Sequence, residues 1–285
     1  MSGQGDRVRS KAKRIVQQVF PAEGVYWDGL LQKGPPAGLI LDMELIQNND
    51  ECNPWNAITP MVTPLDALLK EGHLTRENLV LRIGDLAKAV AYMHEQKIAH
   101  FLLNTESLKA TLGTPPKKFE ESHAGLKWIE TMVIGEFRSA SDAKEYDFDG
   151  QEKPNYQYYQ SPELRVNHSG ESDDNHAYAL AILVLRLLLP EGELEHLEKL
   201  SNELRINARR TYNPGNRPKQ TIDILKKWKK DFEWDLSDDI LQLLAKMLCP
   251  ASYGRFAPEG RMKVKDFATD WEGSSDYQSA EKATE

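Results

Sequence analysis

The chain has 285 residues, of which 40% are apolar and 28% are charged, as is ordinary for a globular protein with a buried core. A net charge of −8 argues against a general nucleic-acid-binding surface, which requires an excess of Lys and Arg. The two cysteines, Cys52 and Cys249, are far apart and have no metal-ligand spacing, which excludes a disulfide framework and a cysteine-based zinc site.

Apolar runs long enough to span a membrane are missing from the sequence. The best candidate, Ala177 to Leu189, is too short to cross a bilayer and is typical of a buried helix. The N-terminal segment MSGQGDRVRSKAKR lacks the apolar core of a signal peptide. We therefore expect a cytoplasmic or nuclear protein that binds neither membranes nor nucleic acid.

The N-terminal quarter of the chain is predicted to be mixed in structure. Apolar residues at positions 8, 12, 15 and 19 predict a helix within the first twenty residues, which Pro21 ends. Strand-like runs follow at residues 24–31, 38–45 and 58–62. A short helix is expected at residues 65–71, because Pro64 can open it and Gly72 can close it.

Helices are predicted to dominate the rest of the chain. Thr75 is a good N-cap for a long helix that ends at Glu95. The segment 176–189 is apolar almost all round, so we expect it in the middle of the fold. The other expected elements are loops at 97–108 and 139–154, a strand at 128–137, and helices at 193–209, 222–232 and 237–248. The polar residues after Trp271 predict a disordered tail.

Five segments resemble, in order, the landmarks of eukaryotic-type protein kinases. They are the helix and catalytic loop (LAKAVAYMHEQKIAHFLLNTESLKA, 86–110), the strand before the magnesium-binding triplet (VIGEFRSA, 133–140), the end of the activation segment (YYQSPEL, 158–164), the central helix (AYALAILVLRLL, 177–188) and a late helix (ILQLLAKMLCPASYGRF, 240–256). Each match alone is weak, but their order and spacing together imply a protein kinase fold.

This resemblance implies an α+β protein with two lobes. Residues 1–72 would form a reduced N-terminal lobe with few strands, residues 73–272 a mainly helical C-terminal lobe, and residues 273–285 a disordered tail. The glycine-rich loop and the strand lysine with which kinases hold ATP are missing from the sequence. We therefore expect that the protein binds no cofactor and no metal.

The positions that carry kinase catalysis are degenerate. His100 matches the loop histidine, but Leu102 stands where the catalytic aspartate would be. Asn104 replaces the loop lysine, Ser107 replaces the metal-binding asparagine, and Glu136 replaces the magnesium-binding aspartate. An alkyl group at position 102 has no oxygen to orient a substrate hydroxyl, so the resemblance implies a pseudokinase without catalytic residues.

Structural positions of the kinase fold are matched more closely. Glu163 and Arg255 match a buried ion pair that stabilises the lower lobe of kinases, and losing one partner of such a pair costs about 3–5 kcal/mol. The aspartate of the central helix, which binds the backbone of the catalytic loop in active kinases, is replaced by His176.

Two segments are candidate interaction surfaces. One is the acidic loop that contains Tyr146. The other is a basic helix with Lys227, Trp228 and Lys230, where a docking role competes with a simpler interpretation. In the simpler interpretation, the apolar face that includes Trp228 packs on the core and the lysines are solvated.

The function that the resemblance favours is a catalytically inactive scaffold or regulator. Its partner would be a protein, such as an active kinase or a kinase substrate. The alternative hypothesis is an atypical phosphotransferase or nucleotide-dependent transferase with a site rebuilt from His100, Glu106 and Glu136. A third hypothesis is a structural subunit of a larger complex.

Overall fold

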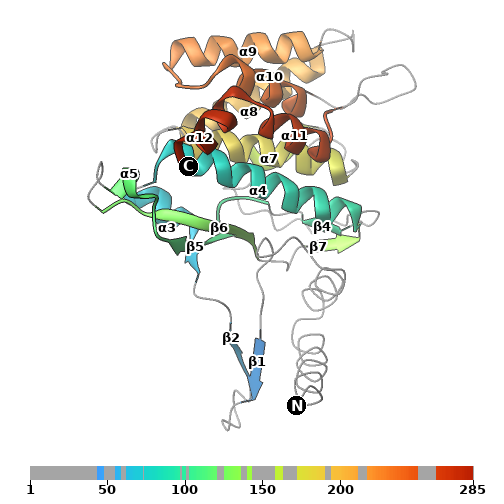
Figure 1. The fold of residues 1–285 in the computed structure, drawn as a ribbon. Coiled ribbons are helices and arrows are strands. Elements are labelled where there is room, and N and C mark those ends of the chain that lie inside the picture. The colour runs from blue at the N-terminus through green and yellow to red at the C-terminus, as the bar shows by residue number, and fades with distance from the viewer. Residues whose placement is uncertain are drawn as a thin grey trace.

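The computed structural model describes residues 44–47, 55–58, 62–72, 74–96, 98–100, 103–120, 125–135, 140–142, 158–162, 172–189, 194–210, 217–249 and 261–284. Over these ranges the protein is α+β and mostly helical, with a small three-stranded antiparallel sheet. In Figure 1 the long helix α4 lies between this sheet and the stack of the other long helices.

The helices are α3 (Leu65–Glu71), α4 (Arg76–Glu95), α5 (Lys117–Glu120), α7 (Ser172–Leu188), α8 (Leu194–Arg210), α9 (Arg217–Asp231), α10 (Asp238–Leu248), α11 (Val264–Glu272) and α12 (Ser275–Thr284). The strands are β1 (Glu44–Gln47), β2 (Trp55–Ile58), β3 (Thr63–Pro64), β4 (Ile98–His100), β5 (Leu108–Gly113), β6 (Trp128–Ile134) and β7 (Ala140–Asp142). The helix predicted within residues 1–20 and the run at 24–31 lie outside the described residues.

The strands form three separate antiparallel groups. β1 pairs with β2, β4 pairs with β7, and the largest sheet has the order β3-β5-β6. The β5–β6 register shifts between Thr111 and Leu112, where a bulge interrupts the ladder. The loops expected at 97–108 and 139–154 therefore contain short strands, β4 and β7, near their starts. Three residues are too few to give a recognisable alternation of apolar and polar side chains.

The buried centre of the molecule is α7, as its apolar sequence predicts. Every residue from His176 to Leu185 is at most 3% exposed. The helices α4, α8, α10 and α11 contact it. Only a helix surrounded by other elements can bury all its faces, so the apolar sequence of 176–189 correctly predicted a central position.

The caps of two predicted helices are confirmed. The Thr75 side chain accepts a hydrogen bond from the backbone N–H of Asn78 at 3.2 Å, which satisfies one of the free donors at the start of α4. Gly72 ends α3 with φ of +69°, a left-handed conformation that glycine adopts without strain.

Among the helices that the structure describes, a membrane span is not found, because none combines the required length with a sufficiently apolar sequence.

The predicted disordered tail is wrong over residues 275–284, which form helix α12. Its first turn is capped by Ser274, whose hydroxyl oxygen accepts a hydrogen bond from the Tyr277 backbone N–H at 3.3 Å. Ala280 is 2% exposed, and Asp276 forms an ion pair with Arg76 at the start of α4. Small and polar residues make these contacts, so the low hydropathy of the segment did not indicate a packed helix.

A glycine in α4 permits the close approach of α12. A Cβ atom at Gly84 would lie 3.0 Å from Cε2 of Tyr277 and 3.5 Å from Cδ1 of Trp271. The first distance is shorter than an ordinary van der Waals contact. Glycine in a helix interior usually costs about 0.5–1 kcal/mol relative to alanine, and here the packing of α11 and α12 explains its presence.

Candidate functional site

The loop that joins β4 to β5 contains the candidate site residues Asn104 and Ser107. Four hydrogen bonds within residues 104–107 close the loop, and three of them connect Asn104 with Ser107. Oδ1 of Asn104 accepts the backbone N–H groups of Glu106 at 2.8 Å and of Ser107 at 3.0 Å. The Asn104 N–H donates to Oγ of Ser107 at 3.1 Å, and that hydroxyl donates to the Asn104 carbonyl at 2.8 Å. The two side chains thus replace the backbone pairing that a regular element would supply.

Burial restricts what these two side chains can bind. Asn104 is 3% exposed and Ser107 is 2% exposed. Their oxygen atoms are already used within the turn, and a metal ion would have to compete with those bonds for the same lone pairs. The pair therefore stabilises the loop, and its geometry does not favour coordination of a magnesium ion or a phosphate.

His100 is fully buried and connects β4 to the end of β6. Its Nε2 lies 2.7 Å from the carbonyl oxygen of Gly135. A carbonyl can only accept, so the Nε2 atom carries the proton and donates. Glu106 is exposed to solvent, in contrast to the buried His100. Neither residue lines the groove between α4 and α12 that is described below.

His176 on α7 binds the backbone of β4. Its Nε2 accepts the backbone N–H of His100 at 2.8 Å. Its Nδ1 lies 2.5 Å from Nε2 of His94 on α4, and the planes of the two rings, whose centroids are 4.7 Å apart, differ by 18°. Burial first, and then the neighbouring His94 and His100, hold the pKa of His176 well below its usual value.

The sequence predicted no contact for His176 beyond its place in the central helix. In the structure it accepts the backbone N–H of His100. His94 was not considered as a site residue. Its position six residues before His100, at the end of a predicted helix, was the only available signal. The remaining candidates, Leu102, Glu136, Tyr146, Glu163 and Arg255, lie outside the described residues.

The basic helix α9 buries one side and exposes the other. Leu225 is fully buried, and Trp228 is 6% exposed. The Trp228 indole N–H donates to Oε2 of Glu203 on α8 at 2.7 Å, which fastens α9 to α8. Lys227 and Lys230 are exposed, and Lys227 forms an ion pair with Glu203 at 3.4 Å. The predicted apolar face is confirmed at Leu225 and Trp228, and of the three interaction candidates here only the two lysines are available to a partner.

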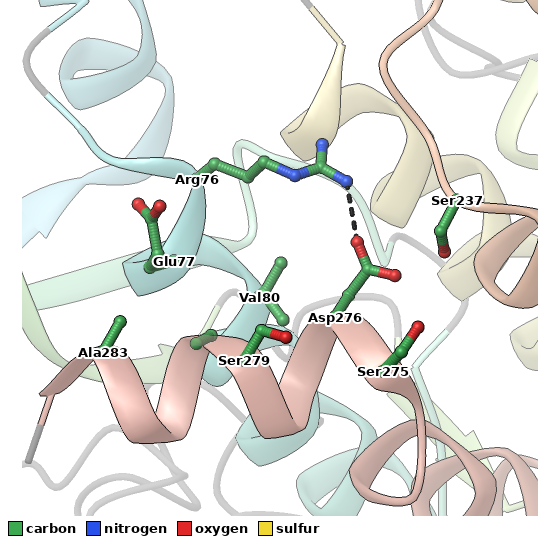
Figure 2. Close-up of a pocket in the computed structure, with 9 residues that line it drawn as sticks. Arg76, Glu77, Val80, Ser237, Ser275, Asp276, Ser279 and Ala283 are labelled. Atoms are coloured by element: carbon green, nitrogen blue, oxygen red, sulfur yellow. Dashed lines mark hydrogen bonds and ion pairs between the residues drawn. The ribbon is translucent and has the colours of Figure 1, made fainter.

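Figure 2 shows a groove of about 350 Å³ between the first turn of α4 and α12. Arg76 and Asp276 face each other across it, with Nη2 and Oδ1 3.0 Å apart. The Ser275 hydroxyl donates to Oδ2 of Asp239 at 2.9 Å, and Ser237 caps α10. These polar groups bind one another, so the groove is a polar seam that joins α12 to α4 and α10.

Within the described ranges, no three His, Cys, Asp or Glu side chains are grouped to hold a metal ion. Comparisons of the chain with protein-family models and with curated proteins gave no match. Function is therefore inferred from the described side chains, their burial and their hydrogen bonds.

Proposed function

We propose that this chain is a catalytically inactive pseudokinase that acts as a scaffold or regulator by binding a protein partner. The observation that supports this most is the Asn104–Ser107 turn. In the kinase resemblance these residues match the loop lysine and the metal-binding asparagine, and in this protein they are buried and hydrogen-bonded to each other. The neighbouring Leu102 has no oxygen with which to orient a substrate hydroxyl.

The pairing of structural elements is compatible with this proposal. The strand β4, which precedes the loop that resembles the catalytic loop, pairs with β7, which follows the triplet that resembles the magnesium-binding triplet. The central helix would bind the catalytic loop backbone, and His176 accepts the N–H of His100. A protein that keeps these contacts and lacks the chemical groups retains a shaped surface without phosphoryl transfer.

Magnesium and ATP at millimolar concentration are expected to leave the thermal unfolding midpoint unchanged. A ligand present at about 100 times its dissociation constant, bound only to the folded state, would add about 2.7 kcal/mol and shift the midpoint visibly. The measurement is thermal unfolding with and without nucleotide, followed by an assay for phosphate transfer. A magnesium-dependent shift that is lost in Glu136→Gln would contradict the proposal and favour the transferase.

The exposed lysines of α9 are the proposed contact for the partner. Reversing both charges in Lys227→Glu with Lys230→Glu should weaken a partner complex about tenfold, because rim charges act mainly on association. The matched control is Lys117→Glu with Lys118→Glu, two adjacent exposed lysines on α5. The measurement is quantitative affinity capture followed by titration of the captured partner. Equal loss in both variants, or in neither, would remove α9 as the contact.

A further inference from the structure

Three histidines from three elements form one chain of hydrogen bonds. The chain runs from the backbone of His100 on β4 through His176 on α7 to His94 on α4. The backbone N–H at its start can only donate, so Nε2 of His176 must be unprotonated. A neutral His176 then carries its proton on Nδ1, which donates to Nε2 of His94. The direction of both side-chain contacts is therefore set by one backbone amide.

Each contact in this chain of hydrogen bonds already holds one proton, so an additional proton leaves two N–H groups facing each other. A proton added to Nε2 of His94 would face the Nδ1–H of His176. If His176 changed tautomer to accept it, its Nε2–H would face the backbone N–H of His100. A doubly protonated His176 gives the same conflict. Protonation of the pair therefore breaks at least one of the two bonds, whichever ring takes the proton.

We propose that this histidine chain is a proton-sensitive lock, in which Nε2 of His176 holds β4 and the following loop against α7 and releases them when His176 gains a proton. His94 is half-buried, so it is the member of the pair that solvent protons can reach directly. His100 and His176 are fully buried. The release concerns β4 and the loop at residues 103–107, while the apolar packing of α7 does not depend on these bonds.

The described charged side chains beside His94 and on α10 and α11 form ion pairs of their own. Besides burial, the pKa of His176 responds to the described neighbours His94 and His100. On α4 the next residue, Glu95, pairs with Lys265 of α11 at 3.2 Å. On α10 and α11, which also contact α7, Lys246 pairs with Asp270 at 3.7 Å.

The direction of the pH effect follows from burial. The folded protein holds the pKa of His176 well below about 6.5, the ordinary value that the opened form regains. The opened form therefore binds more protons at acid pH, and the closed form is favoured less as the pH falls below 6.5. The hydrogen bond between His176 and the His100 backbone keeps its full effect above pH 6.5. It is lost progressively as the pH falls toward the pKa of His176 in the folded protein.

The test is hydrogen exchange at the backbone amide of His100, measured by NMR at pH 7.5 and 5.5 and corrected for intrinsic exchange. We expect protection to fall about tenfold, since one proton taken up below pH 6.5 changes the opening equilibrium up to tenfold per pH unit. His94→Gln with His176→Gln offers carbonyl acceptors that do not titrate, and this double variant should remove the pH dependence. The control variant is His196→Gln on α8. His196 takes no part in these hydrogen bonds, so this variant should keep the pH dependence.

Unchanged protection in the wild-type protein, or the same tenfold loss in the double glutamine variant, would overturn the proposal. A second measurement needs no substitution. Nitrogen chemical shifts of the imidazole rings at pH 7.5 should show His176 protonated on Nδ1 and unprotonated on Nε2. The opposite tautomer would contradict the direction of the chain and with it the lock.

Discussion

Replacing Asn78 with alanine is expected to lower the free energy of unfolding by about 2–6 kcal/mol. The Asn78 side chain is fully buried on α4, where its Nδ2 donates to the carbonyl of Ile129 and its Oδ1 accepts the N–H of the same residue, both at 2.9 Å. Ile129 belongs to β6, the last strand of the sheet order β3-β5-β6. Alanine leaves both backbone groups of Ile129 without these partners, and each buried polar group left unpaired costs about 1–3 kcal/mol.

The measurement is urea unfolding of the wild type, Asn78→Ala and Asn78→Asp. Aspartate has nearly the same shape but places an acceptor against the Ile129 carbonyl, so it should also destabilise strongly. Glu198→Ala, an exposed position on α8, should change the free energy by less than about 0.5 kcal/mol. A loss below about 1 kcal/mol for Asn78→Ala would show that the sheet does not depend on this connection to α4.

Asn104→Ala should lower the free energy of unfolding by about 2–4 kcal/mol, because the N–H groups of Glu106 and Ser107 lose their acceptor. Asn104→Asp keeps an oxygen at this position and should recover more than half of the loss. The informative variant is Asn104→Lys, which introduces the residue that the kinase resemblance would place here in an active enzyme. We expect it to be as unstable as the alanine variant and to bind no nucleotide.

Urea unfolding gives the three stabilities, and thermal unfolding with magnesium and ATP reports nucleotide binding by the lysine variant. A stable Asn104→Lys protein that binds nucleotide would mean that the turn is dispensable and that this protein can form a nucleotide site. Such a result would contradict both the structural role of Asn104 and the proposed inactivity.

Sequence could predict the helices whose own residues show a cap or a pattern of apolar side chains. α7 is apolar on all sides, and α10 combines a Ser237 cap with an apolar stripe, so both were expected at nearly their observed positions. α9 begins at Arg217, five residues before the predicted start at 222, because its first turn is polar. α12 was not predicted, since its packing depends on Gly84, far away in the chain.

In the candidate site, contacts between residues close in sequence could be predicted, and contacts between distant residues could not. Asparagine and serine three residues apart are typical of a side-chain-closed turn, so the Asn104–Ser107 bonds had a local signature that could have been recognised. The contact of His94 with His176 joins residues 82 positions apart and has no local pattern. Only the fold, which brings α4 and α7 together, makes these two rings neighbours.

The seam between α4 and α12 has a consequence for biosynthesis. Arg76 and its partner Asp276 are 200 residues apart. A ribosome that adds about 5–20 residues per second needs about 10–40 s to make the chain between them. During that interval the surface of α4 around Gly84 has no α12 to cover it. A long separation between partners also slows folding, so the nascent chain exposes this face as a target for chaperones until its last helix emerges.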